Sequence, residues 1–246
     1  MILAAGLGTR LRPLTNDRPK ALVEIAGRTL LEITLERLRS FGVREVIVNT
    51  HHFADQMQQY LAAHANFSMR VEISREDDLL DTGGGLKRAA WFFLEGPGKD
   101  EPFLLHNVDV LSTIDLAAMM RFHRERDALA TLAVQQRPTS RYLLFDRDGL
   151  LCGRRAGLDG TPELVRPAEA VQPLAFAGVH MLSPRIFSEL TEQGAFSIID
   201  AYLRLAAAGE RIAAFSADAY YWRDLGKPES IAQAARDIEI GIYPGR

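Results

Sequence analysis

The chain has 246 residues, 47% hydrophobic and 25% charged, so it can bury the core of one large α/β domain. Its net charge is -3 and its Lys and Arg residues are scattered, so no basic stretch indicates nucleic acid or an anionic membrane as a partner. The single cysteine, Cys152, excludes an internal disulfide, and the six His residues lack Cys/His metal-site spacing. We expect a cytoplasmic monomer or homodimer with small phosphate ligands.

The first half of the chain alternates short apolar runs with longer segments of helical periodicity. Strands are expected at residues 1–5, 43–50, 69–74 and 102–110, and helices at residues 30–41, 54–63 and 84–94. This alternation predicts βαβ crossovers and a mostly parallel sheet that helices cover on both faces. No stretch approaches the roughly 20 apolar residues of a membrane span, and glycines begin too early for a signal peptide.

The second half adds antiparallel features. A hairpin turn is expected at Asp148-Gly149, between the apolar runs of residues 142–153. Other strands are expected at residues 128–134, 176–183, 211–218 and 220–225, and helices at residues 116–126, 184–190, 197–208 and 228–240. The chain as a whole is therefore predicted to be a single α/β domain, a Rossmann-like three-layer sandwich with a mixed, mostly parallel central sheet.

The clearest functional signal is the Gly-rich segment LAAGLGTRLRPLTNDRPKAL at residues 3–22. Gly6 and Gly8 follow a strand, where backbone N–H groups can approach phosphate oxygens. Arg10 and Lys20 add two cations, which suit the about four negative charges of a triphosphate. A Walker loop and a dinucleotide fingerprint are both disfavoured, because their Gly-Lys-Ser/Thr and third glycine are missing. A tight turn with solvated cations would explain Gly-x-Gly alone, but not the whole segment.

This segment resembles the signature of the sugar-1-phosphate nucleotidyltransferase family, approximately AAG-x-G-T-R-L-x-P-L-T-x(3)-P-K-P. The residues that match at the family's spacing are Ala4, Ala5, Gly6, Gly8, Thr9, Arg10, Leu11, Pro13, Leu14, Thr15, Pro19 and Lys20. Ala21 replaces the second Pro. Residues 24–31 and 81–85 resemble two further family motifs, so the resemblance covers nearly the whole chain. It is closest to the short, single-domain branch of N-acetylmuramate-1-phosphate uridylyltransferase and the heptose-1-phosphate guanylyltransferases.

The resemblance implies an enzyme that transfers a nucleotidyl group from an NTP to a sugar-1-phosphate, with Mg²⁺ as cofactor and pyrophosphate as by-product. It implies a nucleotide-binding half at residues 1–130 and a sugar-binding half, with the C-terminal helix, at residues 131–246. Arg10 and Lys20 inherit the catalytic contacts with the triphosphate. The remaining residues expected around the nucleotide are Ala4, Ala5, Gly6, Gly8 and Thr9 in the loop, and Glu76, Thr82 and Gly83 near the base.

Two carboxylates are candidate metal ligands. Asp109 lies at the end of an apolar strand, where ligands of open α/β sheets bind, although Val108 precedes it where the family has Gly. Asp224 lies in Trp-Arg-Asp-Leu-Gly, which resembles the family's W-x-D-x-G motif. Mg²⁺ is typically held by one or two carboxylates plus phosphate oxygens, so these two suffice, with Asp109 also catalytic. The alternative is that Asp109 caps a turn and Asp224 pairs with Arg223.

The sugar contacts are expected at Asn107, Gly178 and Asp200 by resemblance to family segments. Gly178 could instead mark a bulge, and Asp200 could serve the helix dipole. The Glu-Lys pair that grips the sugar in many hexose-specific relatives is missing between residues 131 and 171, which favours a muramate or heptose substrate. Its substitute is left open among Arg154, Arg155 and Arg166.

The base and the rival functions are less constrained. A carboxylate at Glu76 would accept from the ring N–H of uracil or guanine, which favours UTP or GTP over CTP. A phosphocholine-type cytidylyltransferase is one alternative, because Tyr220, Tyr221 and Trp222 could cage a quaternary ammonium. A non-catalytic regulatory paralogue that binds an NDP-sugar is the other; its charged site residues would be expected to be lost, whereas this chain keeps them.

Overall fold

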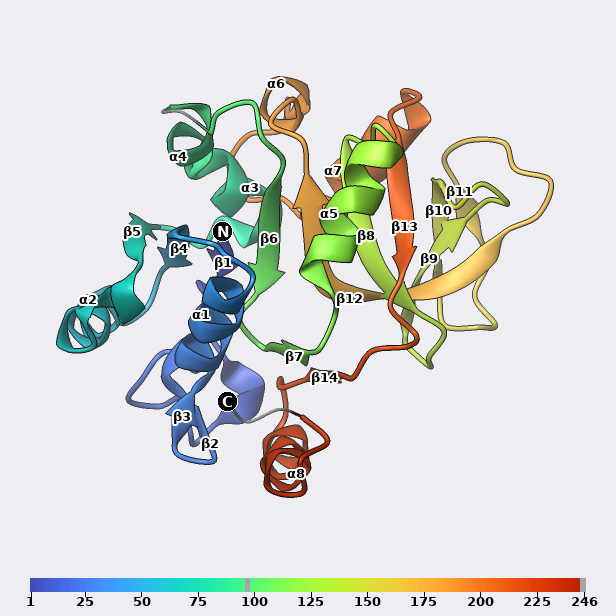
Figure 1. Cartoon of the computed structure of the whole chain (residues 1–246). Helices are drawn as coiled ribbons and strands as arrows, with labels where there is room; N and C mark the ends of the chain where they lie inside the picture. The colour runs from blue at the N-terminus through green and yellow to red at the C-terminus, as the bar shows by residue number, and fades with distance from the viewer. Residues whose placement is uncertain (96–97, 244–246) are drawn as a thin grey trace. The chain divides into compact units, whose positions relative to one another are not determined.

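The structure, a computed structural model, describes residues 1–95 and 98–243 (Figure 1). These residues gather into two compact units that are interleaved along the chain. Unit 1 comprises Met1–Asp81, His106–Ile114 and Tyr221–Arg246, and unit 2 comprises Thr82–Leu105 and Asp115–Tyr220. Strand β6 (Phe103–Asn107) has its first three residues in unit 2 and its last two in unit 1.

Unit 1 is built around a parallel sheet. Its other elements are β1 (Ile2–Leu3), η1 (Thr9–Leu11), η2 (Lys20–Leu22), β2 (Glu24–Ile25), β3 (Arg28–Thr29), α1 (Leu30–Ser40), β4 (Glu45–Thr50), α2 (Ala54–Ala63), η3 (Ala65–Ser68), β5 (Arg70–Arg75), β7 (Val110–Ser112), β14 (Trp222–Asp224) and α8 (Pro228–Glu239). The strand order is β6–β1–β4–β5, with Ile2 opposite both His106 and Val48. In β4 the run Val46, Ile47 and Val48 is fully buried, as expected for a parallel strand without alternation.

Local chemistry sets the helix boundaries in unit 1. The Thr29 side chain caps α1 by accepting a hydrogen bond from the Glu32 amide at 3.1 Å, a contact worth about 1 kcal/mol. α8 begins with Pro228, whose missing N–H costs nothing in the first turn. β7 and β14 form a separate two-stranded antiparallel ladder, which lies beside α8 in Figure 1.

Unit 2 is largely antiparallel. Its elements are α3 (Asp81–Arg88, whose first residue belongs to unit 1), α4 (Ala90–Leu94), α5 (Leu116–Glu125), β8 (Ala130–Gln135), β9 (Arg141–Phe145), β10 (Leu151–Ala156), β11 (Glu163–Leu164), β12 (Gln172–Leu182), α6 (Ile186–Glu189), α7 (Ile198–Ala207) and β13 (Ile212–Ser216). The strand order is β11–β10–β9–β12–β6, and β8 pairs with β12 and, in parallel, with β13. Gly149, at φ 72°, turns the β9–β10 hairpin as predicted.

The predicted fold class, a mixed sheet flanked by helices, is confirmed. α2 has the predicted bounds, whereas the helix expected at residues 84–94 is two helices, α3 and α4, and begins earlier, at Asp81. Glycine disfavours a helix interior by about 1 kcal/mol, so the three glycines at residues 83–85 gave no signal that the helix extends before residue 84. The close approach of Phe196 explains one of these glycines, because a Cβ on Gly83 would lie 2.2 Å from the Phe196 ring.

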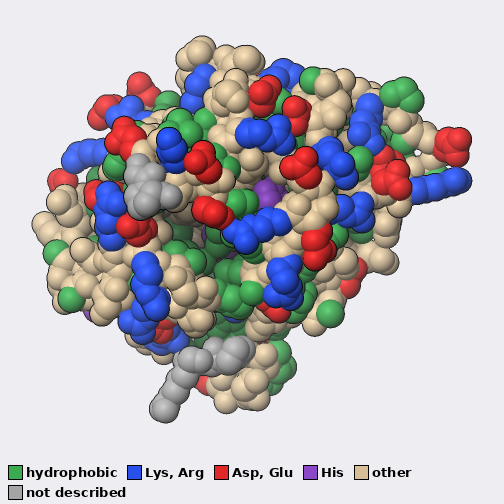
Figure 2. Space-filling view, turned by 45° about the horizontal axis from the view of Figure 1, so that its top comes forward, with side chains coloured by type: hydrophobic (Ala, Val, Ile, Leu, Met, Phe, Trp, Pro, Cys, Tyr) green, Lys and Arg blue, Asp and Glu red, His purple; other side chains and the backbone are tan. Residues whose placement is uncertain are grey.

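The surface agrees with the scattered charge of the sequence. On the face that Figure 2 shows, Lys and Arg side chains are mixed with Asp and Glu side chains instead of forming one basic area. None of the helices in the described part of the chain has the length and apolar character needed to cross a membrane.

Buried His123 predicts a pH-dependent stability. Its side chain is 2% exposed, its Nδ1 lies 2.9 Å from the Thr131 hydroxyl, and burial, followed by Arg124, lowers its pKa to about 4. Below about pH 6.5 the His123 imidazole is protonated in the unfolded chain, whereas in the folded chain it stays neutral down to about pH 4. The free energy of unfolding therefore decreases as the pH is lowered from about 6.5 to about 4. The loss from this residue is up to about 3 kcal/mol.

Urea unfolding of His123→Gln between pH 7 and pH 4 should therefore show a shallower loss of stability than the wild type. His106 is also buried, and burial lowers its pKa to about 4. The free energy of unfolding of the variant should therefore still depend on pH, though less steeply than that of the wild type. His64→Gln, at an exposed position, is the matched control and should keep the wild-type slope. Equal slopes in His123→Gln and wild type would contradict the prediction.

Candidate active site

The Gly-rich loop follows β1, and side chains of unit 1 hold its backbone. The Ala4 amide donates to Asn49 Oδ1 at 2.7 Å, which ends the strand ladder at Leu3. The Thr15 hydroxyl donates to the Gly8 carbonyl at 2.8 Å. Gly8 has φ 63°, and a Cβ there would lie 2.9 Å from Thr15 Cγ2, so the turn requires glycine.

The outer side of the loop is open. A Cβ on Gly6 would meet no atom within 4 Å, and Gly6, Thr9 and Arg10 are exposed. Arg10 makes no hydrogen bond or ion pair with any residue that the structure describes. The loop therefore offers backbone amides and an uncommitted guanidinium to an anionic ligand.

Lys20 and Asp109 form the central charge pair of the site. Lys20 lies at the start of η2 and is 9% exposed, and its Nζ donates to Asp109 Oδ2. A buried ammonium is retained only where an opposite charge compensates its desolvation, and Asp109 supplies that charge. The predicted catalytic residues Lys20 and Asp109 are thus in direct contact.

Asp224 is brought to Asp109 by the ladder of β7 and β14. Asp224 is opposite Val110, the residue after Asp109, and the Leu225 amide donates to the Asp109 carbonyl at 2.8 Å. Asp224 Oδ1 accepts from the Gly226 amide at 2.9 Å, and Arg223 pairs instead with Asp237 at 2.8 Å. The alternative in which Asp224 pairs with Arg223 is therefore wrong.

Gly226 packs between the free cation and the second carboxylate. A Cβ at this position would lie 2.7 Å from Arg10 Nη2 and 2.8 Å from Asp224 Oδ1. Arg10 and Asp224 therefore approach the same small volume, which only a residue without a side chain leaves free. The sequence motif contains this glycine, but its role as the spacer for Arg10 appears only in the structure.

Glu76 differs from its expected role as an open acceptor for the base. It is 2% exposed; Oε1 accepts from Asn49 Nδ2 at 2.7 Å and Oε2 accepts from the Leu80 amide at 3.1 Å. Because Asn49 also holds the Ala4 amide, Glu76 supports the Gly-rich loop at one remove. Sequence reasoning missed Asn49; its signal is a polar residue directly after the buried apolar run of β4.

Thr82 and Gly83 lie in unit 2 and within α3, not in an open loop. The Gly83 amide donates to the Phe196 carbonyl at 2.9 Å, and the Thr82 hydroxyl accepts from the Ile198 amide at 3.0 Å. These groups hold the start of α7. Their contact with a base stays a prediction.

The predicted sugar residues have distinct surroundings. Gly178 has φ 74° and lies where the pairing of β12 with β8 shifts register, so it marks a bulge. Asp200 lies in the first turn of α7, exposed, and pairs with Arg154 Nη1 at 2.7 Å. Asn107 is the last residue of β6, opposite Leu3 in unit 1.

Of the three arginines left open, Arg154 is the one paired with Asp200. Its Nε also pairs with Glu163 at 2.7 Å. Arg166 instead pairs with Asp146, and Arg155 lies over the Tyr142 ring, with 5.9 Å between its Cζ and the ring centroid. The geometry therefore separates Arg154 from the other two.

The donor set fits a hard cation that keeps most of its own ligands. Within the described ranges no cluster of three or more His, Cys, Asp or Glu side chains could hold a metal by itself. The β7–β14 ladder brings the backbones of Asp109 and Asp224 next to each other, and Mg²⁺ usually completes its shell with waters and substrate phosphates. Two carboxylate residues on neighbouring stretches of backbone match that requirement.

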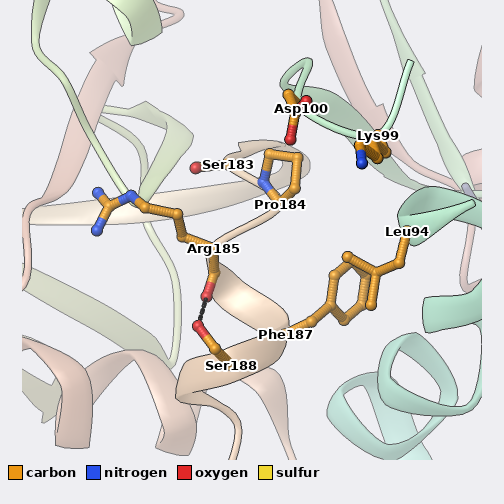
Figure 3. A pocket seen from close by; sticks show the side chains of 8 residues that line it. All are labelled: Leu94, Lys99, Asp100, Ser183, Pro184, Arg185, Phe187 and Ser188. Carbon is orange, nitrogen blue, oxygen red and sulfur yellow. Dashed lines mark hydrogen bonds between the residues drawn. The ribbon is translucent and has the colours of Figure 1, made fainter. Parts of the chain in front are cut away.

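A cavity in unit 2 is lined by none of the predicted site residues (Figure 3). Its volume is about 520 Å³, with Lys99 and Asp100 on one side and Leu94 and Phe187 on the other. The Ser188 hydroxyl on its wall donates to the Arg185 carbonyl at 2.8 Å. The hollow therefore belongs to the packing around α6, not to the phosphate loop.

Comparison with known proteins identifies the fold and then the family. The structure superposes on HddC from Yersinia pseudotuberculosis complexed with GMP-PN, with a TM-score of 0.74 at 23% identity over 96% of this chain and 97% of that one. It superposes on a UDP-glucose pyrophosphorylase complexed with UDP-glucose with a TM-score of 0.76 at 19% identity, over 98% and 97% of the two chains. The fold is that of the nucleotide-diphospho-sugar transferases.

Sequence comparison then gives the family. The family model described as Nucleotidyl transferase matches residues 1–240. The N-acetylmuramate alpha-1-phosphate uridylyltransferase of Caulobacter vibrioides is 35% identical over 249 residues, which cover 97% of this chain and 96% of that protein. The UTP--glucose-1-phosphate uridylyltransferase of Synechocystis sp. is 28% identical over 97% of this chain, but only 62% of that protein is covered. The chain belongs to the nucleotidyl transferase family and is an enzyme of that class.

Gly226→Ala should separate catalysis from stability. The added methyl displaces the ends of Arg10 and Asp224, both of which can move away, so the fold loses little while the site loses its geometry. We expect the melting temperature to stay within about 4 °C and kcat/KM to fall about a hundredfold. Gly98→Ala, at a glycine with open space around it and no positive φ, is the control for the effect of replacing a glycine. Unchanged kinetics in folded Gly226→Ala would remove Gly226 from the site.

Proposed function

We propose that this enzyme transfers a nucleotidyl group from UTP or GTP to a sugar-1-phosphate, giving an NDP-sugar and pyrophosphate in a Mg²⁺-dependent reaction. The observation that carries the proposal is the gathering of Arg10, Lys20, Asp109 and Asp224 beside the open Gly-rich loop. The Caulobacter vibrioides relative, named as a sugar-phosphate uridylyltransferase, supports the same reaction class.

The reaction requires positioning and charge compensation more than proton transfer. An oxygen of the sugar-1-phosphate attacks the α-phosphorus of the NTP, a new O–P bond forms, and the bond to the β-phosphate oxygen breaks with release of pyrophosphate. The attacking oxygen is already anionic, so no general base is needed. Arg10, which has no partner among the described residues, is the group free to bind the departing phosphates.

Lys20 differs from Arg10 because its ammonium is already paired with Asp109. Its ammonium is held at the carboxylate before substrate binds, and an α-phosphate near Asp109 would share that same cation. Transition-state charge is stabilised best by groups that need no reorganisation, which describes a buried, pre-positioned lysine. Bound Mg²⁺, held by Asp109 and Asp224, would neutralise phosphate charge and orient the reacting groups.

The acceptor is proposed to be a muramate or heptose phosphate. The missing Glu-Lys pair of hexose-specific relatives favours this choice, and the relative named for N-acetylmuramate supports it. Arg154, paired with Asp200, is the cation proposed to replace the pair. For the base, Glu76 would have to exchange its bond from Leu80, so another acceptor near residues 76–80 is an equal choice for the uracil or guanine ring N–H.

Turnover should require a divalent cation held by Asp109. Pyrophosphate release should stop in excess EDTA and return with MgCl₂, and Asp109→Asn should lower kcat about a hundredfold or more, because it removes the charge that faces Lys20 and the cation. Asp148→Asn, the same change at the exposed β9–β10 turn, should leave kcat unaltered. Full activity in EDTA, or normal kinetics in folded Asp109→Asn, would refute the metal site.

A matrix of substrates tests the acceptor and base. We expect the highest kcat/KM for UTP or GTP with N-acetylmuramate-1-phosphate or a heptose-1-phosphate, with glucose-1-phosphate roughly ten- to a hundredfold poorer, since one unpaired buried polar contact costs about 1 to 3 kcal/mol. Pyrophosphate release measured for each NTP and sugar phosphate in one buffer gives the ranking. A best pair of dTTP with glucose-1-phosphate, or CTP with phosphocholine, would overturn the assignment of substrates.

A further inference from the structure

Asp237 is a buried carboxylate on α8 that the reaction above does not use. It is 3% exposed. Its Oδ2 accepts from the Tyr221 hydroxyl at 2.6 Å and from Arg223 Nε and Nη2 at 3.0 and 2.8 Å. Its Oδ1 accepts from Gln233 Nε2 at 2.8 Å. Both oxygens are thus committed, and three of the four bonds come from Tyr221, directly before β14, and Arg223, within it, instead of from α8 itself.

These bonds fix one face of β14. Tyr221 and Arg223 are alternate residues and therefore point to the same side of the strand, toward α8, while Asp224 lies on the other side. Thr113, directly after β7, binds the backbone of Tyr221. Its amide donates to the Tyr221 carbonyl and its hydroxyl accepts from the Tyr221 amide, both at 3.0 Å. The strand that carries Asp224 is therefore held at one edge by β7 and Thr113, and through its side chains by Asp237 of α8.

The consequence concerns the cation next to Asp224 in the chain. Arg223 is adjacent to Asp224, and a half-buried Asp beside an unpaired Arg would be expected to attract it. In the structure the Arg223 charge is balanced by Asp237, and the only hydrogen bond to the Asp224 carboxylate from the described residues comes from the Gly226 amide. Without Asp237, Arg223 would be an unbalanced positive charge one residue from Asp224, and that charge would repel a divalent cation at the Asp224 carboxylate.

We infer that Asp237 is a positioning residue for Asp224: by holding and neutralising Arg223 on the α8 side of β14, it keeps the Asp224 carboxylate available to a divalent cation. The inference rests on the proposed metal site and adds a residue outside that site. It assigns to the C-terminal helix a part in cation binding that does not require contact with substrate.

The test is Mn²⁺ affinity of the full chain, measured by EPR titration of free Mn²⁺ in the presence of a non-hydrolysable NTP analogue. Asp237→Asn should weaken Mn²⁺ binding about tenfold because Arg223 loses its counter-charge. Arg223→Gln alone should bind Mn²⁺ as the wild type does, and Asp237→Asn combined with Arg223→Gln should regain the affinity of the Arg223→Gln single variant. Tyr221→Phe, which leaves the Arg223–Asp237 pair intact, should change Mn²⁺ affinity less than threefold.

Glu239→Gln is the matched control, since it makes the same charge change at an exposed position of α8 and should leave Mn²⁺ binding unaltered. A purely structural Asp237 would instead make Arg223→Gln as damaging as Asp237→Asn and the double variant no better, and that outcome overturns the inference. If Asp237→Asn does not fold, the Arg223→Gln result decides alone: wild-type affinity supports the inference and weakened affinity overturns it.

Failure of the proposed metal site is visible separately. If Asp224→Asn binds Mn²⁺ as tightly as the wild type, the metal site itself is refuted and this inference with it. If Asp224→Asn weakens binding while Asp237→Asn does not, the metal site stands and only the role of Asp237 is lost.

Discussion

The candidate site depends on the short antiparallel ladder between β7 and β14. The two carboxylates lie far apart in the sequence, and neither local propensity nor charge would bring them together. Asp224 pairs with Val110, and the Leu225 amide donates to the Asp109 carbonyl. These bonds place the backbones of the two acids side by side. Because these bonds join main-chain groups, they hold the two residues in place independently of the charge on their side chains.

Lys20 and Arg10, the two cations of the site, differ in burial and in pairing. Lys20 is largely buried and neutralised by Asp109, whereas Arg10 is exposed and has no partner in the described part of the chain. A buried ammonium without a counter-charge would be costly, so Lys20 and Asp109 stabilise each other's placement. The exposed guanidinium carries no such cost and keeps its full capacity for a bidentate phosphate contact.

Polar groups of the predicted site hold the backbone within each unit. In unit 1, Asn49 joins the Ala4 amide to Glu76, and in unit 2, Thr82 and Gly83 hold residues 196–198. Buried polar atoms are nearly always satisfied by hydrogen bonds, so a side chain that looks available in a motif can already be engaged in the fold. The same reasoning explains why Arg223 pairs with Asp237 and not with its neighbour Asp224.

The sequence by itself determined the α/β class, the bounds of strongly periodic helices such as α2, and the residues of the Gly-rich loop, because these depend on local periodicity and on glycine's backbone freedom. It indicated Asp109 through its place at the end of an apolar strand and Asp224 only through a motif. Tertiary structure alone decided that Lys20 faces Asp109, that Gly226 separates Arg10 from Asp224, that Glu76 is buried against Asn49, and that α3 begins at Asp81. Each of these depends on contacts between segments distant in the chain, and periodicity and propensity, which describe neighbours in sequence, carry no information about such contacts.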